Sequence, residues 1–346
     1  MKQVFLAVVV VVVVVVGCKR GLEITERAPP DGGTAASSAS STTRPTASAP
    51  RASAHPSASA SASTPAPPRI VAPLLVARLD GRRAAILLDR EPPKPPEKKP
   101  AGATLLSRGP ILTAGIELPE AARTAVARAA FATTYRLGSV RDAKAVCSGR
   151  LEQVADLARI VADDPTAPAL TDAGPSALAE ATFERGEHSV AAIVTLDAAC
   201  APGTLWAVPQ GAPEPTALPT PKLDGVATKR IEASLAASHE PYRALPKGKE
   251  WSERFDVIGI GQDRAWVVAV HWMPGTPTQV CALVDVTTRP PKAIAAGSLC
   301  PESLEGATAF EGKPVMWFAQ ALARVEDTDL IVEYFPTSAT GTYGSP

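Results

Sequence analysis

Cysteine is the residue type in this chain whose number and spacing say most about its chemistry. A thiol can form a disulfide, bind a soft metal, or serve as a redox centre or nucleophile. Five cysteines occur in 346 residues, and no two of them are separated by two residues, so the CxxC pattern of zinc sites and thioredoxin-like redox centres is missing. The sequence therefore predicts no metal site and no cofactor. Four cysteines lie in the C-terminal two-thirds of the chain: Cys147, Cys200, Cys281 and Cys300.

Cys18 stands apart from these four. It comes directly after an apolar stretch, residues 4–17, that contains nine consecutive valines. Lys2 lies before this stretch, and Lys19 and Arg20 come directly after Cys18. A short positive start, an apolar stretch and a small residue at its end are typical of a secretory signal peptide. The stretch is shorter than the roughly 20 residues that a helix needs to cross a bilayer. An uncleaved membrane anchor with an incidental cysteine is the alternative interpretation.

The four residues Val15-Val16-Gly17-Cys18 resemble the lipobox of bacterial lipoproteins. The resemblance implies that a diacylglycerol is attached to the Cys18 thiol, that the signal peptide 1–17 is cleaved off after Gly17, and that the new N-terminus is acylated. Two or more acyl chains hold a protein stably on a membrane. Position 19 is lysine rather than the aspartate that favours inner-membrane retention in some Gram-negative lipoproteins. We therefore expect a lipid-anchored protein of the cell envelope at the outer membrane, on its periplasmic or its surface face.

The four remaining cysteines are an even number in a chain with an export signal, which predicts disulfide bonds. Four cysteines allow three connectivities. We expect the pairing that is local in the sequence, Cys147 with Cys200 and Cys281 with Cys300, and the other two connectivities stay open.

Histidine and serine provide weaker candidates for catalysis. Glu184, Glu187 and His188 could bring carboxylates and an imidazole together, but the intervening Arg-Gly pair is typical of a solvated turn. His239 is expected at a helix end, where a cation interacts favourably with the helix dipole, and His271 in a sheet. The chain contains neither an HExxH metal motif nor a GxSxG nucleophile motif. We predict no catalytic residue.

The tryptophans provide one further indication of binding. At an exposed concave face they would bind sugars or peptides, whereas in a core they contribute apolar area. We expect core packing. The five tryptophans are Trp206, Trp251, Trp266, Trp272 and Trp317, and Trp266 and Trp272 are expected on one face of a strand.

A linker is expected between the lipid anchor and the folded part. From Ala28 to Pro68 the chain consists almost wholly of Ala, Ser, Thr, Pro and Gly, which cannot bury enough surface to offset the entropy of ordering. The predicted organisation is thus a signal peptide at 1–17, a lipidated N-terminus and disordered linker at 18–68, and a globular region at 69–346. The globular region is one domain or two lobes divided near the proline-rich stretch 209–221.

The globular region is predicted to have an α+β fold, mainly antiparallel β-sheet with a few flanking helices. Three helices are expected. The first covers Pro119–Ala132, and the third covers Val226–His239 with Asp224 as its cap. The second is indicated by five apolar residues at helical spacing: Leu151, Val154, Leu157, Ala158 and Val161. Strands are also expected, and three pairs of them are joined by turns: Leu74–Leu79 with Ala84–Leu88, Ser189–Leu196 with Thr204–Val208, and Val315–Val325 with Leu330–Phe335. Two further strands are expected in Ala265–Trp272 and Gln279–Thr287.

Composition and motifs together favour a non-enzymatic binding or interaction module anchored to the envelope membrane. The charge is balanced, 35 basic against 35 acidic residues, so no basic field indicates nucleic-acid binding. The membrane, reached through the N-terminal lipid, is the one predicted partner, and a protein or glycan partner stays unidentified. The alternative is a periplasmic hydrolase whose site is assembled from sequence-distant residues.

Overall fold

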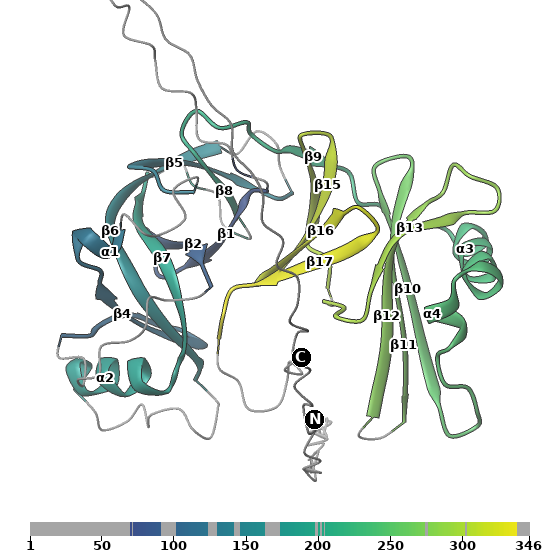
Figure 1. Ribbon diagram of the computed structural model, residues 1–346, viewed down its shortest axis with the longest axis horizontal. Helices are drawn as coiled ribbons and strands as arrows, with labels where there is room; N and C mark the ends of the chain where they lie inside the picture. The colour runs from purple at the N-terminus through teal and green to yellow at the C-terminus, as the bar shows by residue number, and fades with distance from the viewer. Residues whose placement is uncertain are drawn as a thin grey trace, which may run out of the picture. The chain divides into compact units, whose positions relative to one another are not determined.

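The computed structural model describes residues 70, 72–90, 102–123, 130–141, 146–162, 174–197, 200, 203, 205–273, 276–301 and 303–337. The predicted signal peptide, Cys18 and the linker lie outside the described residues. Ala66–Pro346 forms one compact unit that contains two β-sheets (Figure 1). None of its described helices has the length and apolar character needed to span a membrane.

The first sheet is built from the first eight strands in the order β3-β4-β6-β5-β8-β1-β2-β7. All of its pairs are antiparallel, and an additional pairing of β6 with β7 closes six of the strands into a ring. The strands are β1 (Leu74–Arg78), β2 (Arg83–Asp89), β3 (Thr104–Arg108), β4 (Ile111–Glu117), β5 (Thr134–Ser139), β6 (Val146–Val161), β7 (Glu187–Leu196) and β8 (Leu205–Pro209).

The second sheet has the order β10-β11-β12-β13-β17-β16-β15-β14-β9 and is antiparallel except between β13 and β17. That parallel contact has one registered pair, Ala296 with Asp329, so it joins two antiparallel meanders. The strands are β9 (Thr216–Leu218), β10 (Ser252–Ile260), β11 (Arg264–Met273), β12 (Thr276–Asp285), β13 (Lys292–Gly297), β14 (Gly306–Phe310), β15 (Lys313–Phe318), β16 (Ala321–Glu326) and β17 (Asp329–Tyr334).

Side chains from both sheets form one hydrophobic cluster, which we call the shared cluster. Trp206 from β8 and Trp317 from β15 are both fully buried in it. A buried tryptophan removes roughly 150–250 Å² from water, about 4–6 kcal/mol of hydrophobic free energy before the entropy of ordering is subtracted. The cluster consists of Ile70, Leu75, Leu79, Ala85, Leu87, Leu106, Val140, Ala155, Leu157, Ala191, Ile193, Trp206, Val208, Ala212, Phe310, Val315, Trp317, Leu322 and Phe335.

Among the described residues, four helices accompany the sheets: α1 (Glu120–Arg123), α2 (Pro175–Arg185), α3 (Gly225–Ser238) and α4 (Glu240–Arg243). α2 packs on β3, β4 and β6, with Leu178 and Phe183 buried. α3 buries Ile231 and Leu235 against the face of the β10–β13 meander, and the Asp224 side chain accepts a hydrogen bond from the Ala227 N–H. The N-cap and the buried residues of α3 are those that the sequence predicts.

The predicted fold class is confirmed as mainly antiparallel β-structure with a few helices. β1 and β2 form the predicted hairpin around Asp80-Gly81. β11 is buried on both faces from Ala265 to His271, and the two predicted faces of β12 lie in two different clusters. β7 and β8 exist but do not pair with each other, because β8 pairs with β1 and β5. The expected strand 315–325 is two strands, β15 and β16.

The helix predicted on residues 151–161 is wrong, because this segment belongs to the long strand β6. β6 pairs with β4, β5 and β7, and both of its faces are buried from Val154 to Ile160 apart from a small exposed part of Asp156 and Arg159. A strand buried on both faces loses its polar alternation, and its apolar residues can then fall by chance at helical spacing. Of the helix predicted at Pro119–Ala132 the structure describes only α1, and residues 124–129 lie outside the described part.

Candidate functional site

His188 lies at the start of β7, where two elements supply hydrogen-bond acceptors to its ring. Nδ1 is 2.9 Å from Oδ1 of Asp156 on β6, and Nε2 is 2.9 Å from the backbone oxygen of Phe183 on α2. In the β6–β7 register Ala158 lies opposite His188 and Asp156 opposite Val190, so Asp156 and His188 are diagonal neighbours on one face. The Phe183 ring is perpendicular to the imidazole, and the centres of the two rings lie 4.7 Å apart.

Both ring nitrogens of His188 face acceptors, so the doubly protonated imidazolium satisfies this geometry best. The hydrogen bond to Asp156 raises the pKa of His188 above its usual value, and the negative charge of Asp156 and the Phe183 carbonyl act in the same direction against partial burial. Phe183 belongs to the last turn of α2, where a cation also interacts favourably with the helix dipole.

The bonded imidazolium has no lone pair to accept a proton, so His188 is not arranged as a general base. His188 therefore does not supply a general base to the sequence-distant hydrolase considered above. The geometry instead assigns His188 to the attachment of α2 to the sheet.

The carboxylate partner of His188 differs from the one that the sequence suggests. Glu187 accepts a hydrogen bond from the Thr337 N–H, and Asp156 takes the place beside the imidazole. Asp156 is 32 positions away from His188 in the chain, so local spacing could not identify it. Interpreting residues 151–161 as a strand antiparallel to β7 would have placed it there.

Arg159 is a second polar residue that the sequence analysis did not single out. It is 3% exposed, and its guanidinium lies 4.4 Å from the centre of the Phe335 ring. Its nitrogens donate to Gln320 Oε1 at 2.8 Å and to the carbonyls of Phe335 and Pro336. Burial lowers the pKa of Arg159 to about 10, which leaves it charged at neutral pH. Arg159 thus ties β6 of the first sheet to the C-terminal hairpin of the second.

His271 lies in β11 beneath the loop that follows α4, and it is almost fully buried. Its Nδ1 is 2.6 Å from the Pro246 oxygen and its Nε2 is 3.5 Å from Glu253 Oε2 on β10. Tyr242 of α4 packs nearby against Phe255, and burial, followed by the charges of Glu232 and Glu253, raises the pKa of its hydroxyl to about 12. These contacts hold the loop and α4 against the strands.

His239 caps α3, as predicted, with its backbone N–H bonded to the Leu235 oxygen. Burial lowers the pKa of its side chain, and the nearby Arg243 lowers it further. The neutral imidazole is therefore favoured, so the cationic helix end that we expected is not supported.

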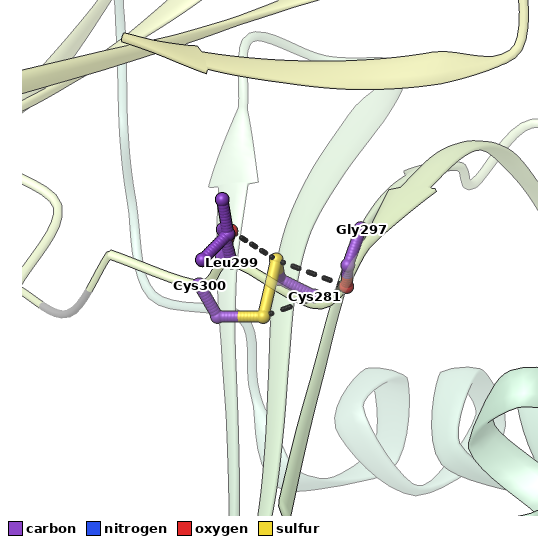
Figure 2. Close-up of a disulfide and its surroundings, with 4 residues drawn as sticks. All are labelled: Cys281, Gly297, Leu299 and Cys300. Carbon is purple, nitrogen blue, oxygen red and sulfur yellow. Dashed lines mark hydrogen bonds between the residues drawn. A yellow bond between two sulfur atoms is a disulfide. The ribbon is translucent and has the colours of Figure 1, made fainter. Parts of the chain in front are cut away.

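Two disulfides cross-link the unit. Cys147 and Cys200 are bonded with their Cα atoms 5.0 Å apart, and Cys281 and Cys300 with theirs 5.4 Å apart. The pairing is the sequence-local one that we expected. Figure 2 shows that Cys281 and Cys300 lie beside the backbone of Gly297 and Leu299, with Cys281 Sγ 3.4 Å and 3.2 Å from their carbonyl oxygens. Since bonded sulfurs carry no hydrogen, these are packing contacts.

A carboxylate accompanies the first disulfide. Cys147, Cys200 and Asp197 bring two sulfurs and a carboxylate oxygen within 4.8 Å of one another. The two sulfurs are bonded to each other, so they offer no thiolate to a metal. Asp197 accepts a hydrogen bond from the Ser148 N–H at 3.0 Å, which fixes it at the start of the Cys200 turn.

Three of the five tryptophans, Trp206, Trp266 and Trp317, are fully buried, in line with the expected core packing. Trp251 is half-buried, and Trp272, at the end of β11, is 37% exposed. Trp266 and Trp272 lie on the same face of β11, as expected. Trp266 packs against Phe318 in the core, whereas Trp272 reaches the surface. Cys18, the predicted lipidation site, lies outside the described residues.

Comparison with known proteins finds no matching family model, no matching curated protein and no matching solved structure. Function must therefore be argued from the residues themselves.

Proposed function

We propose that this chain is a lipoprotein of the cell envelope, held at the outer membrane through lipid on Cys18, and that its β-rich unit is a non-enzymatic binding module for a protein or glycan. The observation that carries the proposal is the lipobox-like segment Val15-Val16-Gly17-Cys18 at the end of a signal-peptide-like stretch. The composition of the following residues, to Pro68, suits a spacer between the lipid and the folded unit.

The disulfides support export. Stable disulfides are typical of oxidising compartments outside the cytoplasm, and this unit contains one in each sheet. Each joins residues that are distant enough in sequence, 53 and 19 positions, to restrict the unfolded chain considerably. A module held together in this way suits a protein that works without cytosolic chaperones.

The environment of the histidines supports a binding module over an enzyme. His188 gives both nitrogens to structural acceptors and His271 donates to a backbone carbonyl. Each of these side chains is used to fasten one element to another. An exposed tryptophan, Trp272, offers the kind of surface that glycan and protein partners contact.

The test is mass spectrometry of the mature N-terminus, with Cys18→Ala as the matched control. The wild type is expected to begin at Cys18 and to carry a diacylglyceryl group and an N-acyl chain. Cys18→Ala is expected to lose the lipid and to leave the membrane fraction on carbonate extraction. A wild-type N-terminus that is uncleaved and unmodified refutes the proposed anchor.

A further inference from the structure

β10 is the last strand at one edge of the second sheet, and much of its outer side faces no other strand in the described part of the chain. Its inner side pairs with β11 from Ser252 to Ile260. On the outer side Ile258 forms a bridge with Lys222, and the Gly259 N–H donates to the Pro221 oxygen at 2.7 Å. Val257 is buried, so the open part of the edge runs from Ser252 to Asp256.

The direction of the backbone groups along this edge follows from Gly259. Its N–H points away from β11, and the β10–β11 register continues without a bulge over the whole strand. Because backbone groups alternate in direction along a strand, Glu253, Phe255 and Val257 also direct their N–H and C=O groups outward. Phe255 lies within the open part and offers both a donor and an acceptor.

The charges beside Phe255 are self-complementary. Arg254 and Asp256 flank it, have side chains 40% and 54% exposed, and form an ion pair within the strand. If a second copy of β10 pairs antiparallel about a two-fold axis at Phe255, Arg254 lies opposite Asp256 of the partner subunit, and the same contact occurs twice. Opposite charges directly across an antiparallel pair are stabilising.

The neighbouring registers are disfavoured by the same residues. A two-fold axis at Arg254 places Arg254 opposite itself, and an axis at Asp256 places Asp256 opposite itself. Like charges directly opposite each other are destabilising. Charged residues often protect an edge strand from association, but here their order permits one register.

We propose that β10 is a dimerisation edge, at which a second copy of this chain continues the sheet by antiparallel pairing centred on Phe255. The inference goes beyond the proposed function and does not depend on it. The paired stretch is short, so the dimer is weak in dilute solution. Anchoring on a common membrane would raise the effective concentration of the two copies.

The test is the association state of the mature chain, residues 18–346, with Cys18→Ser to keep it soluble, by analytical ultracentrifugation over a range of concentrations. A reversible monomer–dimer equilibrium is expected. Arg254→Asp places two acidic pairs across the axis and is expected to weaken the dimer about tenfold or more. Arg254→Asp combined with Asp256→Arg restores the opposite-charge pairs and is expected to restore the dimer.

Two controls separate this edge from other effects. Arg108→Asp changes an exposed charge at the end of β3, the strand at the edge of the first sheet in the described part of the chain, and is expected to leave dimerisation unchanged. Thermal unfolding of each variant monitors folding. In hydrogen exchange the amide of Phe255 is expected to become slower as the protein concentration rises. A chain that stays monomeric, a dimer insensitive to Arg254→Asp, or a folded double variant that fails to recover the dimer overturns the proposal.

Discussion

At the scale of single residues, the polar groups of this unit fasten elements to one another. His188 is the clearest case, because β6 and α2 each supply an acceptor to a ring carried by β7. Arg159 has the same role between the two sheets, with carbonyls, an amide and an aromatic ring as its partners. Its Nε is buried and has no hydrogen-bond partner among the described residues, so burying this cation costs free energy that its other contacts must offset.

The His188 contact predicts a pH-dependent stability. Since its pKa is raised in the folded protein, the stabilisation is fully present below about pH 6.5, the value for an unperturbed histidine, and is lost as pH rises through the folded pKa. His188→Gln is therefore expected to lower the free energy of unfolding by roughly 1–3 kcal/mol at pH 5.5 and by less at pH 9. Urea denaturation at both pH values measures this difference.

Asp156→Asn serves as the matched variant, since it removes the charge that raises the pKa of His188 but keeps the size of the side chain. NMR titration of the His188 ring is expected to show a lower pKa in this variant than in the wild type. A wild-type pKa at or below 6.5, or a His188→Gln cost that is the same at both pH values, would contradict the imidazolium assignment.

At the scale of elements, the Trp206 ring of β8 lies directly over β5 because Gly138 has no side chain. Gly138 lies opposite Trp206 in the β5–β8 register, and a Cβ built on it would lie 2.2 Å from Cζ2 of the Trp206 ring. The ring thus fills the space that a side chain at position 138 would occupy. This contact places Trp206 in the shared cluster.

Gly138→Ala is therefore expected to lower the free energy of unfolding by roughly 1–3 kcal/mol, because Trp206 or the β5 backbone must move. Gly81→Ala is the matched control, since a Cβ at Gly81 has no heavy atom within 4 Å and the change is expected to cost about 0.5 kcal/mol or less. Denaturant titration followed by tryptophan fluorescence reports both. Equal costs for the two variants would mean that the close approach is not maintained in solution.

Sequence patterns predicted elements well where one face of an element is polar. The cap Asp224 and the buried Ile231 and Leu235 identified α3, and the Asp80-Gly81 turn identified the first hairpin. They failed for β6, whose two faces are buried and whose apolar residues also fall at helical spacing, whereas β11, buried on both faces as well, was predicted as a strand. The contact between Asp156 and His188 depends on β6, so the site could not be predicted before that strand was assigned correctly.

At the scale of the whole unit, the shared cluster decides whether the two sheets are independent. The chain passes from the first sheet to the second between Pro209 and Thr216, within the stretch where the sequence suggests a division into lobes. Side chains on both sides of that point nevertheless pack together, among them Trp206, Val208 and Trp317. Arg141 and Arg159 add hydrogen bonds between the sheets. We therefore expect the two sheets to unfold together.

Removing one disulfide tests this cooperativity. The Cys147–Cys200 bridge belongs to the first sheet, and replacing both residues by serine is expected to lower the free energy of unfolding by roughly 4 kcal/mol by the loop-entropy model. If the sheets unfold as one unit, the loss appears equally in the slowest-exchanging amides of β7 and of β11. Hydrogen exchange with mass spectrometry measures both strands in one experiment.

The complementary variant removes the Cys281–Cys300 bridge of the second sheet, for which the same model gives roughly 3 kcal/mol. It is expected to reduce protection in β7 as much as in β11. Protection lost only in the sheet that carries the substitution would show that the two sheets open separately. The shared cluster would then hold the sheets together less strongly than the core of each sheet holds that sheet. Equal loss in both sheets means that the shared cluster couples them, because a local opening cannot expose it without separating the sheets.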